Sequence, residues 1–502
     1  MKNNIRINVI VNIIRTIVLT SLSFITFPWV CRYLKDSALG TYTWANTFVS
    51  YFLILAKVGI PNFAIRECVK VRDDKEKLSN KVQMFYLIQL SATLVSFILM
   101  ASVVFTIPQL KDNSSLIFLL ALNFLTGAFS FEWVFIALEK QFYMSIRSIV
   151  ILTLSAILII IFVTNPNDIY IYALLTTSVT GITTIVNLVY ISKYISFKKT
   201  MSYNFKSCVA PLLTLTALSF TISLYNQTDT FILGFIDESK KEVASYSVGV
   251  KGIDIIIGIL TNLSTVFVPR STYYYQKEDK RFFNNLNKYS VNICLFIVLP
   301  AIVTMSILSK EITSLISGTY ADDLNSSYGS AKHVLIILST MMLTYSLGEM
   351  IYGQILLPEK KEKLYLYTLL GGTIINICFS IIFGKYVFKN NPAIGVAIGT
   401  MISELLVITT LIILTWKWIK IAIFNKNTLK LLGATILILI ISLLIKNPIC
   451  SLLESQNLTI SLVYILTTVI VVFIDAILYI GTLILLKENL VYSFIKKKIK
   501  TE

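Results

Sequence analysis

Apolar residues in this chain form nearly continuous blocks of about twenty, separated by short polar stretches. A helix of about 20 residues matches the hydrocarbon thickness of a bilayer, and it satisfies its own backbone hydrogen bonds there. The blocks lack the polar–apolar alternation of transmembrane barrels. The pattern therefore predicts an all-α, polytopic membrane protein. Fourteen spans are expected, near residues 9–31, 41–65, 82–107, 115–138, 147–164, 169–192, 208–236, 243–269, 287–308, 333–357, 364–388, 392–416, 429–446 and 459–486.

Composition agrees with this class. Of 502 residues, 56% are apolar and only 14% are charged, with a mean hydropathy of +0.76. Soluble proteins carry about 25% charged residues. The first block is not expected to be a cleaved signal peptide, because it is too long, contains Arg15 and ends without a small-residue cleavage site. No segment between spans is long enough to form a soluble domain.

The positions of Lys and Arg predict the orientation. With the N-terminus inside, 31 of the 44 basic residues fall in inner segments, ten fall in outer loops, and three lie within spans. Cytoplasmic loops retain positive charge, so both termini are expected in the cytoplasm. A missed or extra span would destroy this alternation.

The same distribution argues against nucleic-acid binding. A net charge of +17 would suggest such a partner for a soluble protein, but here membrane topology and anionic headgroups account for it. The six cysteines form no CxxC pair, so neither a disulfide framework nor a zinc site is indicated. No Walker A loop or GxSxG elbow occurs. We therefore expect no enzyme, no metal site and no cofactor.

The chain contains two similar halves. Leu39-Gly40-Thr41-Tyr42 precedes a span in the first half, and Val243-Ala244-Ser245-Tyr246 does so in the second. Pro61 and Pro269, and Glu132 and Glu349, also match in order. Six spans separate the matches, so the repeats are parallel, as in transporters that alternate access by rocking one half against the other. The predicted domains are an N-terminal six-helix lobe (1–200), a C-terminal six-helix lobe (201–420) and two further helices with a basic tail (421–502).

Charges inside the membrane are the main functional candidates. They cost about 2.5–3.5 kcal/mol on insertion scales and usually face protein or water. The clearest cases all lie in spans 1, 2, 7 and 8: Arg15, Lys57, Asp229, Lys251 and Asp254. Helical spacing adds polar neighbours, Asn12 in span 1 and Asn226 in span 7. These seven residues predict a hydrated cavity with a modest preference for anions.

Structural explanations for the same residues stay open. Lys251 and Asp254 are three residues apart and are well spaced to pair with each other. Arg15 and Lys57 lie near enough to a membrane surface to snorkel. A purely structural role, the stabilisation of a helix junction, is an alternative for Asp229. Glu132 and Glu349 are expected to pair with cations of the inner loops. Glu404 and Asp475 have no assigned role.

Several stretches together resemble the polysaccharide transporters, the Wzx-type O-antigen and capsule repeat-unit flippases of the multidrug/oligosaccharidyl-lipid/polysaccharide exporter superfamily. The resemblance covers nearly the whole chain. The stretches are Leu39-Gly40-Thr41-Tyr42, Gly59-Ile60-Pro61, Arg66-Glu67, Arg72 to Leu78, Asn226 to Asp229, Ile232-Leu233-Gly234, Pro269-Arg270, Gly353 to Leu357, Ile394-Gly395-Val396-Ala397 and Ser403-Glu404.

The resemblance implies two six-helix lobes around a central cavity, plus two C-terminal helices. It also implies the substrate, an oligosaccharide repeat unit on undecaprenyl diphosphate that moves to the outer leaflet of a bacterial plasma membrane, and partners in the polysaccharide polymerase and the chain-length regulator. Such proteins often carry Arg after the Asp of span 7, where this chain has Thr230, so no cationic role is expected there.

Three other functions compete with this one, a multidrug exporter, a lipid II flippase and a polysaccharide polymerase. A polymerase would be expected to carry a large outer loop. A proton or sodium ion is expected to couple transport.

Overall fold

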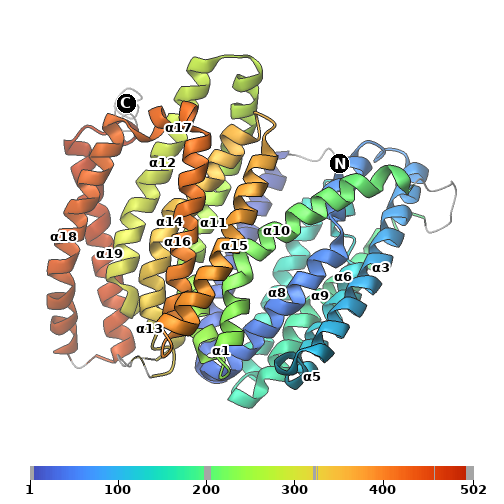
Figure 1. Ribbon diagram of the computed structural model, residues 1–502, viewed down its shortest axis with the longest axis horizontal. Coiled ribbons are helices and arrows are strands. Elements are labelled where there is room, and N and C mark those ends of the chain that lie inside the picture. The colour runs from blue at the N-terminus through green and yellow to red at the C-terminus, as the bar shows by residue number, and fades with distance from the viewer. Residues whose placement is uncertain (1–4, 197–204, 320–323, 325, 457, 493–502) are drawn as a thin grey trace. The chain divides into compact units, whose positions relative to one another are not determined.

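The computed structural model describes residues 5–196, 205–319, 324, 326–456 and 458–492. Within these ranges the ordered elements are all helices, so the expected all-α fold class is confirmed. The chain divides into two compact units, Met1–Lys241 (unit 1) and Glu242–Glu502 (unit 2). Figure 1 labels most of their helices.

Unit 1 is built from ten α-helices and one short 3₁₀ turn among the described residues. They are α1 Ile5–Lys57, α2 Ile60–Val69, α3 Lys75–Thr106, α4 Pro108–Asp112, α5 Ser114–Leu120, α6 Leu122–Ala128, α7 Glu132–Ala137, α8 Gln141–Phe162, η1 Pro166–Asp168, α9 Ile169–Ile191 and α10 Lys206–Ile236.

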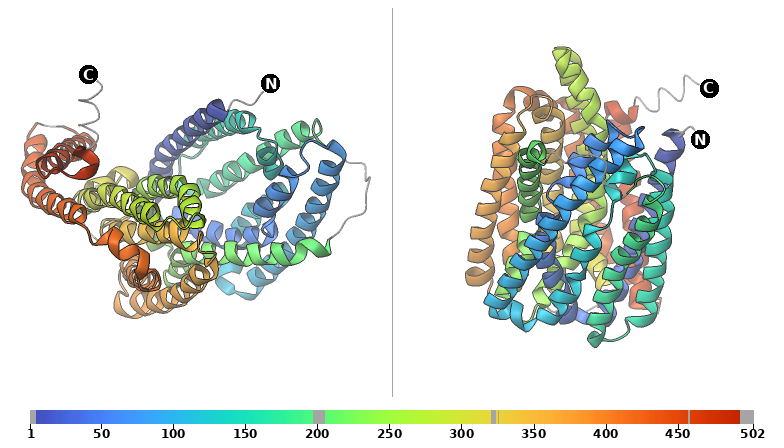
Figure 2. Two further views of the ribbon diagram at one scale, coloured as in Figure 1. Left: turned by 90° about the horizontal axis from the view of Figure 1, so that it is seen from above. Right: turned by 90° about the vertical axis from the view of Figure 1, so that its right-hand side faces the viewer.

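Unit 2 contains nine further α-helices and two π-helical turns in the described part of the chain. They are α11 Lys241–Gln276, α12 Lys280–Ile307, α13 Ser309–Ser317, α14 Ala331–Ile351, η2 Tyr352–Leu356, α15 Glu362–Ile381, η3 Ile382–Val387, α16 Pro392–Leu414, α17 Trp416–Ile423, α18 Lys426–Glu454 and α19 Ile460–Leu485. The hairpin of α11 and α12 extends past the neighbouring helices of its unit (Figure 2).

The expected count of fourteen spans is not confirmed. In the described residues, twelve helical segments are long and apolar enough to cross a membrane, or thirteen if the bent pair Lys241–Asp254 and Ile256–Gln276 is one span. When the bent pair is counted, the remaining difference of one span arises at the start of the chain, where two predicted spans form one helical segment, Ile14–Val69. Its 56 residues would extend about 84 Å if straight. The backbone is non-helical at Lys35 (φ 60°, ψ −177°), which divides α1 into two arms.

The surface of the helices has the character that lipid requires. Large apolar side chains are widely exposed, for example Leu94 (62%), Val189 (69%) and Leu485 (81%). A soluble monomer rarely exposes apolar patches of this extent. The molecule is therefore a membrane protein, as its sequence predicts.

Small residues let helices of unit 2 approach closely. A Cβ added to Gly395 would lie 2.5 Å from the Phe383 carbonyl oxygen, and one added to Gly399 would lie 2.8 Å from the Ser380 amide nitrogen. These glycines are four residues apart on α16, the spacing that brings membrane helices into backbone contact. The Ile394-Gly395-Val396-Ala397 stretch is therefore a packing motif between α16 and the α15–η3 segment.

Two helix ends at matching positions of the two halves share one type of backbone turn. Lys140 donates its amide to the Phe135 carbonyl at 2.9 Å, and Lys361 donates to Leu356 at 2.9 Å. The preceding residues, Glu139 (φ 55°) and Lys360 (φ 56°), are both left-handed. The two turns are 221 residues apart and have the same helix-ending geometry. The same turn also ends α11 at Asp279 and α19 at Glu488, so it is a common helix ending in this chain, and the internal duplication stays a prediction.

Candidate functional site

Helix α1 carries three of the predicted cavity residues. Arg15 lies in its first arm and is partly buried, whereas Lys57 is its last residue and is exposed. A cation at a helix C-terminus is favoured by the helix dipole. Asn12 is also in the first arm, but its side chain lies outside the described residues. The structure thus places Lys57 at a helix end.

The break after Lys57 explains the Gly59-Ile60-Pro61 motif. Gly59 has a φ of 62°, and a Cβ added to it would lie 2.7 Å from the Leu215 Cβ on α10. Only glycine combines this backbone conformation with so close a contact at no steric cost. Pro61 then occupies the first turn of α2, where its missing N–H is harmless.

Helix α10 contributes Asp229 and Asn226. Asp229 is buried (6% exposed), while Asn226 is exposed. Near them α10 packs on the second arm of α1, where the Ser50 hydroxyl donates to Gln227 Oε1 at 2.7 Å. Aromatic rings fill the rest of this contact, with Tyr51 edge-on to Phe231 at a centroid distance of 5.5 Å. Asp229 therefore belongs to a helix that is fixed firmly to α1.

A buried lysine, Lys240, lies at the end of the contact between α1 and α10. Lys240 is 5% exposed, and its ammonium donates to the Gly234 carbonyl and lies 4.2 Å from the Trp44 ring centroid. Burial lowers the pKa of Lys240, against the opposing effect of Asp237 and Glu238. A Cβ on Gly40 would lie 1.8 Å from the Lys240 carbonyl oxygen, and one on Gly234 would lie 2.0 Å from Trp44. The Leu39-Gly40 and Leu233-Gly234 motifs thus shape one tight junction, which we call the Lys240 clamp (Gly40, Trp44, Gly234 and Lys240).

Helix α11 places Lys251 and Asp254 together. Lys251 Nζ lies 3.6 Å from Asp254 Oδ2, with side chains 21% and 47% exposed. The pairing that the sequence left open is therefore present. It leaves this part of α11 without net charge, while both groups stay accessible to a polar partner.

The seven predicted residues are divided between the two units. Unit 1 contains five of them, Asn12, Arg15, Lys57, Asn226 and Asp229, and unit 2 contains Lys251 and Asp254. The central cavity that they would line stays a prediction. Unit 1 has a cavity of its own, with a volume of about 260 Å³, between the first arm of α1 and helices α8 and α9. Ser23, Thr26, Ser155 and Thr176 supply its polar groups, and no charged residue lines it.

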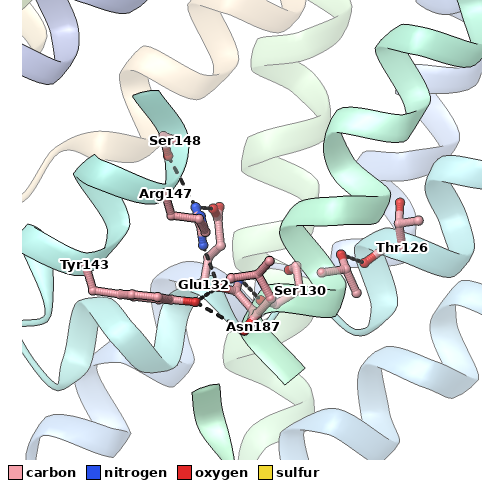
Figure 3. A network of polar contacts seen from close by, with 9 residues as sticks. Thr126, Ser130, Glu132, Tyr143, Arg147, Ser148 and Asn187 are labelled. Carbon is pink, nitrogen blue, oxygen red and sulfur yellow. Dashed lines mark hydrogen bonds and ion pairs between the residues drawn. The ribbon is translucent and has the colours of Figure 1, made fainter. Parts of the chain in front are cut away.

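An ionic network in unit 1 was only partly anticipated (Figure 3). Arg147 is one of the 31 basic residues that the sequence assigned to inner segments, but it lies inside α8 with its side chain 4% exposed. It pairs with Glu132 at 2.5 Å and donates to Asn187 Oδ1 at 2.6 Å. Asn187 also accepts from Tyr143 at 3.0 Å and donates to the Ser130 carbonyl at 2.5 Å.

The expected pairing of Glu132 with a cation is confirmed. The role of Asn187 was missed, although an Asn and an Arg in neighbouring apolar helices are a usable signal, since buried polar groups in membranes seek one another.

The repeat equivalent of this network has a different chemistry. Glu349 on α14 accepts a hydrogen bond from the Tyr365 hydroxyl at 3.2 Å. Among the residues that the structure describes, no lysine or arginine forms an ion pair with Glu349, so the expected cationic partner is not found. The ring of Tyr365 stacks on Tyr352 at 4.3 Å. Tyrosine takes the place of arginine here, so the carboxylate of Glu349 has a neutral hydroxyl as its partner.

Asp475 has a clear structural place. It accepts from Ser442 on α18 at 2.5 Å and from Thr304 on α12 at 3.3 Å. One buried carboxylate therefore links the last two helices to α12.

Known proteins extend this picture. Residues 5–274 match the family model described as "Polysaccharide biosynthesis protein", and residues 215–382 match the MatE model. The chain is 23% identical over 392 residues to the "Putative O-antigen transporter" of Escherichia coli (strain K12), which covers 77% of this chain and 90% of that protein.

Solved structures share the fold. The lipid II flippase MurJ in an inward closed conformation superposes with a TM-score of 0.68 at 18% identity, over 94% of this chain and 99% of that one. An inward-facing MATE family multidrug transporter of the MOP superfamily gives 0.59 at 16% identity, over 80% and 96%. These relatives are transporters and flippases, not enzymes. Because its family model matches more than half of the residues, the chain belongs to the polysaccharide biosynthesis protein family, the polysaccharide transporters of the multidrug/oligosaccharidyl-lipid/polysaccharide exporter superfamily.

Proposed function

We propose that this transporter moves an undecaprenyl-diphosphate-linked oligosaccharide repeat unit, of O-antigen or capsule, from the inner to the outer leaflet of a bacterial plasma membrane. The family match over residues 5–274 carries this proposal. The E. coli relative, described as an O-antigen transporter, supports the same substrate class.

Charge supports an anionic cargo. Arg15 and Lys57 are accessible cations of unit 1, and Lys251 is an accessible cation of unit 2. A diphosphate is a strong acceptor for such groups, and charge-assisted hydrogen bonds to it are about twice as strong as neutral ones. The lipid tail would stay in the bilayer while the sugars and the diphosphate cross in a hydrated path.

Alternating access is the proposed mechanism, because parallel repeats of this kind rock about a shared site. Asp229 is the best candidate for a coupling proton or sodium ion, since it is a buried carboxylate on a helix that packs tightly on α1. Asp254 is already paired with Lys251, so we expect it to tune that cation.

Orientation follows from charge. We propose that both termini are cytoplasmic, on the basis of the excess of basic residues in inner segments. The polymerase and the chain-length regulator would then receive the repeat unit on the opposite side.

The test is translocation of labelled precursor in a strain that lacks its own repeat-unit flippase. Lys57→Ala is expected to reduce arrival at the outer leaflet severely, while Lys57→Arg retains most of it. Lys111→Ala, an exposed lysine elsewhere in unit 1, is the matched control. Unchanged arrival with Lys57→Ala would remove Lys57 from the mechanism. Rescue of a strain lacking lipid II translocation, with no O-antigen or capsule transport, would contradict the proposed cargo.

A further inference from the structure

A pocket of about 510 Å³ opens at one end of unit 2, and none of the predicted cavity residues lines it. Three connections form it, between α11 and α12, between η2 and α15, and at the start of α17. Its floor is aromatic. Phe283 and Trp418 meet edge to face at 4.9 Å, and Tyr275 lies 5.5 Å from Phe283.

The pocket rim has cations in excess of available carboxylates. Lys280, Lys360 and Lys417 line it and are all exposed. Glu359 is already engaged, because it accepts from Trp418 Nε1 at 2.7 Å and pairs with Lys361 at 2.9 Å.

The two other acidic residues of the rim differ in whether their carboxylates are already hydrogen-bonded. Asp279 caps α12 by accepting the Phe282 amide at 3.1 Å. Glu278 is exposed and lines the pocket. Because Lys361 neutralises Glu359, the three lysines face two remaining carboxylates, and the net charge of +1 favours an anion. The aromatic floor favours an anion that carries a ring or a polyol.

Helix α17 marks the level of the membrane surface at this pocket. One face, with Trp418, Ile419 and Ala422, is buried. The other exposes Trp416 (47%) and Ile421 (45%), and Lys417 and Lys420 are also exposed. A short helix with tryptophan and lysine between two spans is typical of the water–lipid boundary. Because Lys417 and Trp418 belong to both α17 and the pocket, the pocket lies at the depth of lipid phosphates.

We propose that this pocket binds a phosphate with a hydroxylated headgroup, such as the phosphoglycerol or phosphosugar head of an anionic lipid. Lys280, Lys360 and Lys417 would hold the phosphate, and the headgroup would lie on Trp418 and Tyr275 with its hydroxyls toward Glu278. Aromatic faces and a carboxylate suit a polyol, while the three lysines supply the attraction for the phosphate. The site is independent of the transported cargo, so it stands even where the proposed substrate fails.

The experiment uses the purified full chain in phosphatidylcholine nanodiscs that contain increasing dioleoyl phosphatidylglycerol. Native mass spectrometry counts the bound lipids. A variant with Lys280, Lys360 and Lys417 all changed to Met is expected to lose one saturable phosphatidylglycerol site, with affinity lower by about 10- to 100-fold at low salt, since each basic residue near the surface contributes to anion attraction. Its melting temperature is measured alongside, because all three side chains are exposed and their loss should leave the fold intact.

The control variant changes Lys277, Lys363 and Lys426 to Met. These exposed lysines lie in or beside connections at the same end of unit 2 but do not line the pocket. Equal loss in both triple variants would show non-specific attraction and would overturn the site. Glucose 1-phosphate in solution forms a second arm. Binding of this probe alone, abolished by the pocket variant, would assign the site to soluble sugar phosphates, and binding of neither probe would refute the proposal.

Discussion

The ion pair of Arg147 and Glu132 predicts that removing one partner destabilises the protein more than removing the other. Arg147 is 4% exposed, whereas its partner Glu132 is 44% exposed. Removing Glu132 leaves a cation in a site closed to water, and breaking a buried pair in this way costs about 3–5 kcal/mol. Removing Arg147 leaves a carboxylate that still reaches the surroundings, so the loss is that of the charge-assisted hydrogen bonds, about 1.5–3 kcal/mol. Glu132→Leu should therefore destabilise the protein more than Arg147→Met.

The assay is equilibrium unfolding of the purified chain in mixed micelles, with the two single variants and the double variant. The double variant should be less destabilised than Glu132→Leu alone, because it has no buried unpaired cation. Asn187 keeps its hydrogen bonds with Tyr143 and the Ser130 carbonyl in each case. A larger loss for Arg147→Met than for Glu132→Leu, or strictly additive losses, would refute the view that burial of Arg147 sets the cost.

Three further predictions concern helix junctions. Gly40→Ala should abolish stable expression, because its Cβ would lie 1.8 Å from the Lys240 carbonyl oxygen, whereas Gly127→Ala, with no neighbour within 4 Å, should be tolerated; equal expression levels in membranes would contradict this. The pKa of Lys240 is lowered in the folded state from its ordinary value of 10.5. At pH values between the folded pKa and 10.5, the unfolded chain therefore binds more protons than the folded chain. The melting temperature should rise as the pH increases through this range. Lys240→Met should lose this rise relative to wild type. Asp475→Leu should lower the melting temperature because it leaves Ser442 without its acceptor, and Asp475→Asn should restore most of it.

The all-α fold class could be predicted from the sequence because the membrane restricts the backbone conformation of spanning segments. Blocks of twenty apolar residues have one backbone solution in lipid, and the exposure of Leu94 and Val189 agrees with it. The number of spans was harder to obtain. At Lys35 one helical run changes direction within a single left-handed residue, without the glycine or proline that usually marks a break.

The candidate site was predicted only in part. Charge in an apolar segment identifies a residue such as Asp229, but hydropathy does not tell whether it faces water, lipid or a neighbouring helix. Lys251 and Asp254 could be paired from their spacing, because contacts within one helix are local. The contact of Arg147 with Asn187 joins residues 40 positions apart, and no periodicity within one helix reveals such a partner. Lys240 was missed as a buried cation for a related reason, since its burial depends on Trp44, which is distant in the sequence.

The sites around Glu132 and Glu349, which match in the predicted repeat, differ in charge. The turns that end at Lys140 and Lys361 have the same backbone hydrogen bond, a helix ending that the chain also uses elsewhere. The side chains beside it have diverged, with Arg147 bound to Glu132 in one half and Tyr365 bound to Glu349 in the other. Protonation or ion binding at Glu132 would have to displace an arginine, whereas at Glu349 it would disturb only a neutral hydroxyl. A coupling step that uses one of these carboxylates is therefore expected to use the half that carries Glu349, since no buried ion pair has to be broken there.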